Sequence, residues 1–184
     1  MDSFEFEADG ALSKKGKILV VDDDATAAST LEAFLEDDFE VLVASSGEAC
    51  LQVVDGFSPD LVLLDIEMPG MNGYETCQNL QKDRDGQVLP VIFISSHDTL
   101  NERLKAYESG GMDFVTKPFN PDELLLKAEK VIKLESDRRQ LAQEKASIQQ
   151  MAMGFLTSMG EMGAVLQFLR NCFTCADYPS LAKM

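Results

Sequence analysis

Three aspartates in this sequence directly follow short apolar runs of the kind that form buried strands. Asp22 and Asp23 come after Ile18–Val21, and Asp65 comes after Leu61–Leu64. On neighbouring parallel strands these carboxylates would lie close together, which is unfavourable unless a cation neutralises them. Carboxylate oxygens without a histidine or cysteine partner suit a hard ion, and Mg²⁺ is expected where phosphate oxygens complete its octahedral shell. For any one of these acids, the alternative is an ordinary capping role at the start of a helix.

Asp65 is also suited to act as a nucleophile. Its carboxylate is ionised at neutral pH and can attack phosphorus, and phosphoryl transfer depends more on positioning and charge neutralisation than on covalent assistance. Ser95 and Lys117 end two further apolar runs. The Ser95 hydroxyl can donate a hydrogen bond to a phosphoryl oxygen, and the Lys117 ammonium can neutralise its charge. A lysine at a strand end is usually only solvated, so its assignment depends on its coincidence with the other strand ends.

The elements that position these residues follow from two alternating sequence periods between Lys17 and about Leu134. Continuous apolar runs predict buried strands at 18–21, 39–44, 61–64, 91–94 and 113–116. Helical spacing occurs between them at 26–36, 47–54, 74–81 and 99–108, and another helix begins at Pro121. This alternation predicts a parallel sheet with helices on both faces. In such a sheet the site lies beyond the carboxyl ends of the strands, where the strand order reverses.

Four blocks of the sequence resemble the signatures of response regulator receiver domains. They are ILVVDD at 18–23, LLDIEMPGMNG at 63–73, PVIFISS at 90–96 and FVTKPF at 114–119. The blocks occur in the family's order and at its intervals, and the resemblance covers about residues 16–134. It implies a doubly wound α/β fold of the flavodoxin-like kind, with five parallel strands in the order 2-1-3-4-5. A long C-terminal helical extension would follow this domain.

The resemblance also implies a phosphoacceptor site. Asp65 is then the residue that receives phosphate from a sensor histidine kinase or a phosphotransfer protein. Mg²⁺ is bound directly by Asp23 and Asp65, usually through water by Asp22, and by the backbone carbonyl of Glu67. A receiver domain assists its own phosphorylation and dephosphorylation but is not a turnover enzyme. The resemblance therefore predicts a signalling protein of the histidine-to-aspartate type.

Ser95, Phe114 and Lys117 complete the site that the resemblance implies. Ser95 and Lys117 contact the phosphoryl group. In the family's switch, the hydroxyl at the Ser95 position moves toward the phosphate while the aromatic residue at the Phe114 position turns inward. Many relatives have tyrosine at that position, but inward rotation needs no hydroxyl. We expect the change to alter the face built by the fourth helix, the fifth strand and the fifth helix, which would signal to a downstream output protein or domain.

A Mg²⁺-dependent hydrolase with an aspartyl-phosphate intermediate is the alternative function. Such enzymes usually have a second acid two residues after the nucleophile, which is the position of Glu67, but the sequence offers no evident substrate cap. Glu67 and His97 also occupy positions that flank the path of an attacking water in this fold. One hypothesis is that they set the phosphate lifetime, and the alternative is that both are solvent-facing loop residues. His97 is the only histidine, so this chain has no separate phosphohistidine module.

A heptad pattern continues from Val131 beyond the receiver-like segment. With Val131 at position a, the d positions are Leu134, Leu141, Ile148, Phe155, Met162 and Leu169. All are apolar, which predicts a coiled coil. Arg138 and Lys145 occupy a positions, where they would repel across a dimer. Asp137 and Glu144 occupy the adjoining g positions, from which they can reach the partner's cations in a parallel homodimer. The alternative is a long amphipathic helix that folds back on its own domain.

The end of the chain gives weaker signals. Glycines at 154, 160 and 163 each disfavour a helix by about 1 kcal/mol relative to alanine, so we expect a break or bend after Met153. Cys172 and Cys175 form a lone C-x-x-C pair without further zinc ligands. We therefore predict a disordered acidic tail at 1–15, a receiver domain at 16–134, and a helical coiled-coil or linker segment at 135–184. The last segment would also fit the beginning of a truncated output module.

Composition argues against several classes of function. The net charge is −16 and Lys and Arg form no cluster, so a nucleic-acid surface is not expected. No apolar run approaches the roughly 18 residues that indicate a membrane span. The N-terminus lacks the basic and apolar regions of a secretory signal. We therefore expect a cytoplasmic protein whose four cysteines are reduced.

Overall fold

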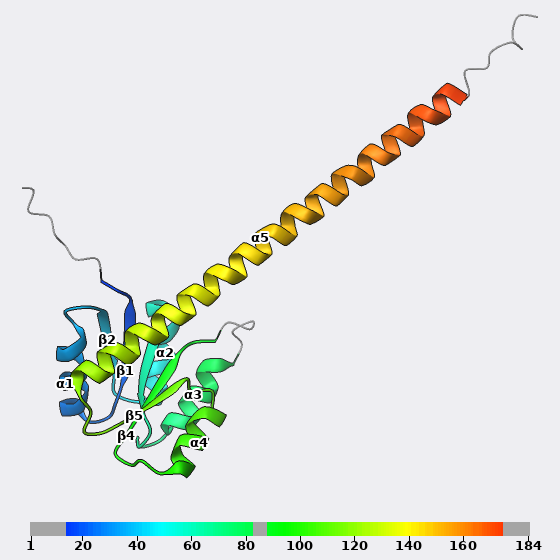
Figure 1. Cartoon of the computed structure of the whole chain (residues 1–184). Coiled ribbons are helices and arrows are strands. Elements are labelled where there is room, and N and C mark those ends of the chain that lie inside the picture. Colours follow the sequence, from blue (N-terminus) through cyan, green and yellow to red (C-terminus); the bar gives the residue numbers. More distant parts are fainter. Residues whose placement is uncertain (1–13, 83–87, 175–184) are drawn as a thin grey trace, which may run out of the picture. The chain divides into compact units, whose positions relative to one another are not determined.

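The computed structural model describes residues 14–82 and 88–174. At its centre is a five-stranded parallel sheet with the strand order β2-β1-β3-β4-β5 (Figure 1). The strands are β1 (Lys17–Val21), β2 (Glu40–Ala44), β3 (Leu61–Asp65), β4 (Val91–Ser95) and β5 (Asp113–Thr116). The helices are α1 (Ala25–Leu35), α2 (Gly47–Phe57), α3 (Gly73–Gln81), α4 (Leu100–Glu108) and α5 (Pro121–Thr174). The predicted doubly wound α/β fold and its strand order are confirmed.

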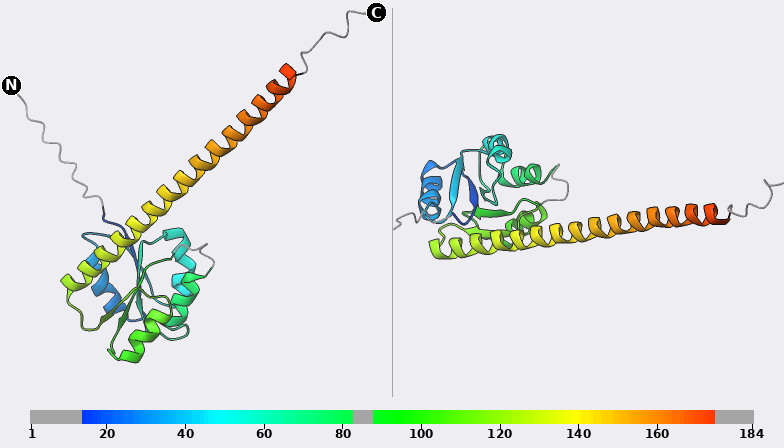
Figure 2. Two further views of the ribbon diagram at one scale, coloured as in Figure 1. Left: turned by 45° about the vertical axis from the view of Figure 1, so that its right-hand side comes forward. Right: turned by 90° about the horizontal axis from the view of Figure 1, so that it is seen from above.

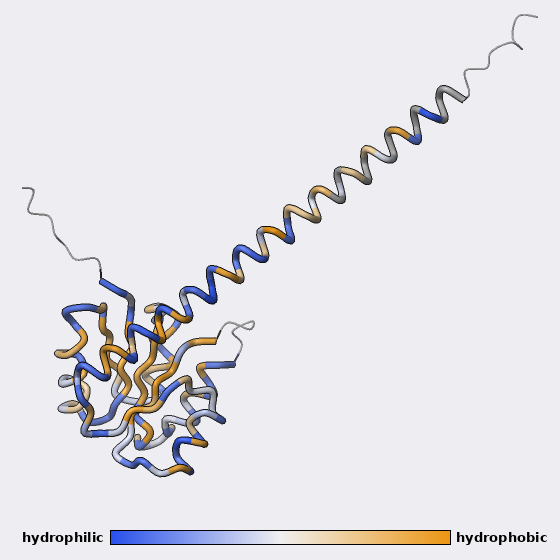
Figure 3. The backbone as a smooth tube through the Cα atoms, in the orientation of Figure 1, coloured by the Kyte–Doolittle hydropathy of each residue, from blue (hydrophilic) through white to orange (hydrophobic). Residues whose placement is uncertain are grey.

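Helices lie on both faces of the sheet (Figure 2), and each face carries a hydrophobic core. Successive side chains of a strand point to opposite faces, so Ile18 and Val20 belong to one core and Leu19 and Val21 to the other. The first core includes residues of α1 and the beginning of α5, and the second includes residues of α2, α3 and α4. All residues of β3 and β4 are buried, as expected for central parallel strands covered on both faces. Figure 3 shows the hydrophobic residues concentrated in these strands.

The point where the strand order reverses lies between β1 and β3. These two strands are neighbours, and their register pairs Val21 with Leu64. From β1 the chain continues to β2 on one side, whereas from β3 it continues to β4 on the other. The residues that directly follow β1 and those that end β3 therefore meet at the carboxyl edge of the sheet, where sites of this fold form.

Defined caps begin the two helices that follow the site loops. Asn72 and Glu75 form a capping box at the start of α3, and Thr99 and Glu102 form another at the start of α4. In each box the capping side chain and the glutamate satisfy backbone N–H groups that a helix leaves without partners. The capping boxes therefore define where the loops after β3 and β4 end, at Asn72 and at Thr99.

α5 runs without interruption from Pro121 to Thr174, so the predicted break after Met153 is wrong. A Cβ atom at Gly154 or Gly163 would meet no other atom within 4 Å. Neither glycine therefore marks a kink or a close contact. The cost of about 1 kcal/mol for each glycine is borne by a helix whose other residues are mostly good helix formers.

α5 contributes to both compact units into which the chain divides, Met1–Glu135 and Ser136–Met184. In the first unit, Leu124, Ala128 and Val131 of α5 are buried in the sheet core. In the second unit every side chain that the structure describes is exposed. Within the described parts of the chain, no helix has the length and hydrophobicity that crossing a bilayer requires.

Several predictions concern residues at the ends of the chain. Residues 1–13 of the tail predicted at 1–15 lie outside the described residues, as does Cys175, and the side chains of Leu169 and Cys172 are likewise not described. Lys15, at the end of that predicted tail, pairs with Asp38 at 2.7 Å and with Glu129 of α5 at 2.6 Å.

Candidate functional site

Three acidic side chains meet at the carboxyl ends of β1 and β3. One carboxylate oxygen from each of Asp22, Asp23 and Asp65 lies within 4.8 Å of the other two. Asp22 and Asp65 are buried, with exposed fractions of 3% and 5%, whereas Asp23 is exposed. An all-oxygen set that is open to water on one side suits Mg²⁺, which keeps several waters and binds few carboxylates together with phosphate oxygens. The residues present therefore fit the predicted ion.

The neighbouring Asp24 has a different task from Asp22 and Asp23. Its side chain accepts a hydrogen bond from the backbone N–H of Thr26 at 2.8 Å and caps α1. That bond is the main reason why the pKa of Asp24 is lowered. The backbone N–H of Asp24 in turn donates to Oδ1 of Asp22 at 2.9 Å. Asp24 therefore caps α1, whereas the capping alternative concerned Asp22, Asp23 and Asp65, whose carboxylates meet at the site.

Lys117 joins this cluster from the end of β5. Its Nζ lies 2.7 Å from Oδ2 of Asp22 and 2.6 Å from Oδ1 of Asp65. The lysine side chain is 22% exposed, so the ammonium is largely withdrawn from water. The lysine therefore places a positive charge between two buried acids that come from β1 and β3.

At both Asp65 and Lys117, burial and the ion pair shift the pKa in opposite directions. Burial raises the pKa of Asp65, and Asp22 adds to the effect, against the opposing influence of the Lys117 ammonium. Burial lowers the pKa of Lys117, but its hydrogen bonds to Asp22 and Asp65 outweigh burial and leave that pKa raised. Lys117 therefore stays protonated and supplies the positive charge that the acid cluster needs.

Ser95 ends β4 beside the acid cluster. It is 1% exposed, and the register places Asp65 opposite Ile94 and Ser95 opposite Thr116. Its Oγ accepts a hydrogen bond from the backbone N–H of His97 at 3.1 Å. The Ser95 hydroxyl is therefore at the carboxyl edge of the sheet, and its oxygen accepts a hydrogen bond from the loop that follows β4.

The loop after β3 is shaped by a close approach that the sequence motif did not identify. A Cβ atom at Gly73 would lie 2.2 Å from the carbonyl oxygen of Asp65, and the Gly73 N–H donates to the carbonyl of Ile66 at 3.1 Å. Only glycine allows this packing. Gly73, the first residue of α3, therefore determines how α3 approaches the end of β3.

Glu67 and His97 lie opposite each other on the loops that follow β3 and β4. Nδ1 of His97 is 3.2 Å from Oε1 of Glu67, and their side chains are 57% and 54% exposed. Both are therefore solvent-facing, as the simpler reading predicted, yet they contact each other. The Glu67 side chain thus points to His97, and the metal role predicted for this residue concerns its backbone carbonyl alone.

Phe114 of β5 is buried beneath α4, away from the acid cluster. Its ring is 2% exposed and belongs to the core that includes α3 and α4. Its backbone carbonyl accepts a hydrogen bond from Nζ of Lys127 at 3.1 Å, and the same Nζ lies 3.2 Å from Asp113. The structure thus groups Asp22, Asp23, Asp65 and Lys117 and keeps Phe114 apart from them.

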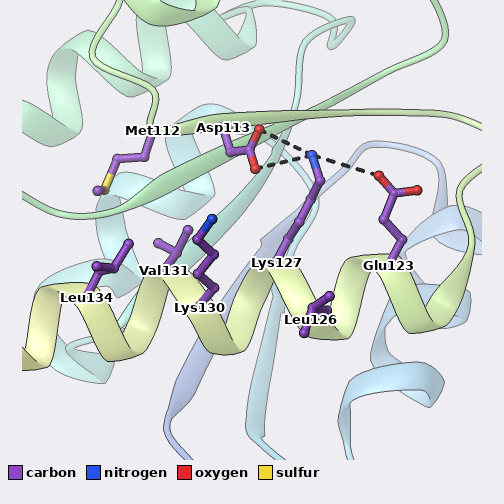
Figure 4. Close-up of a pocket in the computed structure, with 8 residues that line it drawn as sticks. All are labelled: Met112, Asp113, Glu123, Leu126, Lys127, Lys130, Val131 and Leu134. Carbon is purple, nitrogen blue, oxygen red and sulfur yellow. Dashed lines mark hydrogen bonds and ion pairs between the residues drawn. The ribbon is translucent and has the colours of Figure 1, made fainter.

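A pocket of about 350 Å³ lies between the beginning of β5 and α5 (Figure 4). It is lined by Met112, Asp113, Glu123, Leu126, Lys127, Lys130, Val131 and Leu134. In Figure 4 the Lys127 side chain reaches from α5 to Asp113 on β5. The pocket therefore lies where α5 passes the strand that carries Phe114.

Residues 18–129 match the response regulator receiver domain family. Among curated relatives, the probable transcriptional regulator ycf27 of Pyropia yezoensis is 39% identical over 122 residues, which are 66% of this chain and 49% of the relative. Response regulator Rre1 of Synechocystis sp. is 38% identical over 109 residues, which are 58% of this chain and 47% of that protein. The chain thus spans about half the length of these relatives.

Solved structures lead to the same assignment. A putative response regulator from Chloroflexus aurantiacus has a TM-score of 0.61 and 31% identity, over 64% of this chain and 98% of that one. NtrX from Brucella abortus has a TM-score of 0.64 and 30% identity, over 69% of this chain and 29% of that one. The family match covers more than half of this chain. The chain therefore belongs to the response regulator receiver domain family of two-component signalling.

Proposed function

We propose that this chain is a phosphorylation-controlled switch in which Asp65 accepts a phosphoryl group from a phosphohistidine of a sensor kinase or a phosphotransfer protein. The observation that carries the proposal is the position of Lys117, whose ammonium lies 2.7 and 2.6 Å from oxygens of Asp22 and Asp65. It fixes a positive charge beside the nucleophile, where the phosphoryl oxygens would arrive. Charge fixed in advance at that position is the main protein contribution to phosphoryl transfer.

In the proposed transfer, an Asp65 carboxylate oxygen forms a bond to phosphorus while the bond from phosphorus to the donor imidazole nitrogen breaks. The imidazole leaves with the electron pair of that bond. Lys117 transfers a hydrogen bond from Asp65 to a phosphoryl oxygen, and the Ser95 hydroxyl donates to another. Mg²⁺ held by Asp22, Asp23 and Asp65, with the Glu67 carbonyl, would neutralise charge on the phosphoryl oxygens.

The alternative hydrolase has less support. Such an enzyme would use the Glu67 carboxylate as its second acid, but that carboxylate lies 3.2 Å from His97 Nδ1 and is half-exposed. An acid engaged with a neighbouring loop is poorly placed to protonate a leaving group at Asp65. Steady turnover of a phosphomonoester would favour the hydrolase, whereas a single labelling event that is lost in Asp65→Asn would favour the switch.

We also propose that Glu67 and His97 set the lifetime of the phosphate. Their contact joins the loops after β3 and β4 next to Asp65 and Ser95, so it narrows the approach of an attacking water. Glu67→Gln and His97→Gln should each shorten the phosphate half-life. Half-lives equal to that of the wild type in both variants would leave the pair without this role.

The second compact unit is proposed to form a parallel homodimer. Its d positions Leu141, Ile148, Phe155 and Met162 are all more than 60% exposed in the single chain. Such a stripe on a long helix requires a partner helix, and a second copy offers the same heptad. Acids at the g positions 137 and 144 can balance the cations at the a positions 138 and 145 across the parallel seam.

The output of the switch is proposed to be a further protein or domain that reads the face formed by α4, β5 and α5. The ycf27 relative is named a probable transcriptional regulator, and the match with this chain covers about half of its length. The pocket between β5 and α5, lined in part by the exposed Leu126 and Leu134, offers apolar contacts on this face. Phosphorylation would alter that surface through Ser95 and Phe114.

Titration with beryllofluoride, an analogue of the acyl phosphate, tests the central proposal. In excess Mg²⁺ the wild-type chain should bind the analogue saturably in calorimetry, while sedimentation follows its oligomeric state. Asp65→Asn should abolish binding. Asp37→Asn removes an exposed acid from the opposite edge of the sheet and should leave binding unchanged. A wild-type chain that binds no analogue would overturn the proposal.

A further inference from the structure

The side chain of Arg103 links the loop after β4 to the ring of Phe114. Its guanidinium carbon lies 5.2 Å from the centroid of the Phe114 ring. Its Nε donates to Oδ1 of Asp98 at 2.5 Å. The first distance is that of a cation–π contact, and the second contact is a hydrogen bond between opposite charges. Arg103 on α4 therefore contacts both the Phe114 ring on β5 and Asp98 in the loop after β4.

These two contacts bear on the two residues proposed to switch. Asp98 belongs to the short loop between Ser95 and α4, and the same loop bonds to Ser95 through the His97 N–H at 3.1 Å. Phe114 is 2% exposed, whereas the side chains of Arg103 and Asp98 are 42% and 48% exposed. The guanidinium thus covers the ring from the solvent side. A ring that rotated outward would lose this contact.

We propose that Arg103 is a positioning residue that holds Phe114 in its buried orientation and ties that orientation to the loop carrying Ser95. The proposal rests on the proposed function, since it concerns the orientation of Phe114 in the same phosphorylation switch. The contact exists only while the ring is inward, so its loss shifts the equilibrium toward outward orientations. Because inward rotation accompanies phosphoryl binding in that switch, the shift should weaken binding of a phosphoryl analogue.

The expected size follows from the strength of cation–π contacts at partly exposed sites. Removing such a contact should change an equilibrium about two- to fivefold. The Arg103–Asp98 pair by itself is a half-exposed ion pair, which contributes little. A loss of analogue affinity in this range would therefore reflect the contact with the ring.

A double-mutant cycle on beryllofluoride affinity, in excess Mg²⁺, tests the proposal. Arg103→Ala should weaken binding about two- to fivefold, and Arg103→Lys, which keeps the cation, should restore part of it. In a Phe114→Leu background, Arg103→Ala should have no further effect, because the ring is no longer present. A purely structural role for Arg103 would give the same loss in both backgrounds.

Lys17→Ala is the matched control. The Lys17 ammonium also lies 5.2 Å from a ring centroid, that of Phe57, but at the amino end of β1. This variant should bind the analogue as the wild type does, and urea unfolding should show that all variants are folded. Unchanged affinity in Arg103→Ala, or equal losses in both backgrounds, would overturn the role of Arg103. Absence of binding by the wild type would instead overturn the proposed function.

Discussion

Replacing Lys117 with methionine removes the positive charge that both buried acids share. Removing one partner of a buried ion pair costs about 3–5 kcal/mol. The Lys117 side chain is 22% exposed, whereas those of Asp22 and Asp65 are 2% and 7% exposed. Because solvent reaches the lysine, we expect the lower end of the range, about 3 kcal/mol. In urea, with a slope near 2 kcal/mol per molar, the midpoint should fall by about 1.5 M.

The assay is urea unfolding followed by circular dichroism, at one protein concentration, in EDTA and again with excess Mg²⁺. An ion at 100 times its dissociation constant stabilises the folded state by about 2.7 kcal/mol. Mg²⁺ should stabilise Lys117→Met more than the wild type, because without the ammonium the carboxylates attract the ion more strongly.

Lys127→Met provides the matched control for this experiment. The Lys127 side chain is 27% exposed, but its partners Asp113 and Glu123 are 31% and 60% exposed. Its loss should therefore cost less than about 1 kcal/mol. Equal midpoints for Lys117→Met and the wild type in EDTA would refute the reasoning, and so would equal gains from Mg²⁺.

Three further predictions concern other parts of the chain. Gly73→Ala should lower the free energy of unfolding by about 1–3 kcal/mol and weaken analogue binding, since the new Cβ would lie 2.2 Å from the backbone oxygen of Asp65. Gly56→Ala, which has open space around its Cβ, should not destabilise the chain in the same urea assay. Ile148→Asp, at a d position, should convert a dimer to a monomer in sedimentation velocity, whereas Gln143→Asp at an outward f position should not. Burial raises the pKa of Cys77 to about 12, so iodoacetamide at pH 8 should leave this thiol unmodified in the folded chain and modify it in urea, as peptide mass spectrometry would report.

Features that depend on local pattern were predictable from the sequence. The apolar runs that end at Val21 and Leu64 identified β1 and β3, and with them the meeting point of Asp22, Asp23 and Asp65. Burial on both faces makes such runs continuous, and their shortness between polar residues is typical of buried strands. Lys117 was identified in the same way, from its position at the end of a strand.

Helix ends were predicted less well, because they depend on exposed residues. α2 was expected to end at Val54, but it continues to Phe57. Ser58 closes it in a left-handed conformation with φ of 53°, and its N–H donates to the carbonyl of Val54. Phe57 is half-buried against the core and lies three residues after Val54, so it continues the helical spacing across the exposed Asp55 and Gly56.

Contacts between distant residues left no trace in any local pattern. The Glu67–His97 contact joins two loops, and Arg103 meets Phe114 from a different element. Each depends on how a helix or loop packs against the sheet, which tertiary structure decides. The sequence named Phe114 as a switch residue through the family resemblance, but it gave no reason to select Arg103.

Asp22, Asp23 and Asp24 are chemically identical and adjacent, yet one is buried against a lysine, one is exposed at the acid cluster and one caps a helix. What distinguishes them is only how many residues separate each from the last paired residue of β1. Inserting or deleting one residue within β1 would turn its hydrophobic side chains to the opposite faces of the sheet. It would also move each of the three aspartates into the position of its neighbour. The amino-acid composition would hardly change, but the chain would lose the cluster of acids that Lys117 partly neutralises. The role of each aspartate therefore depends on its distance in sequence from the end of β1 as much as on its carboxylate.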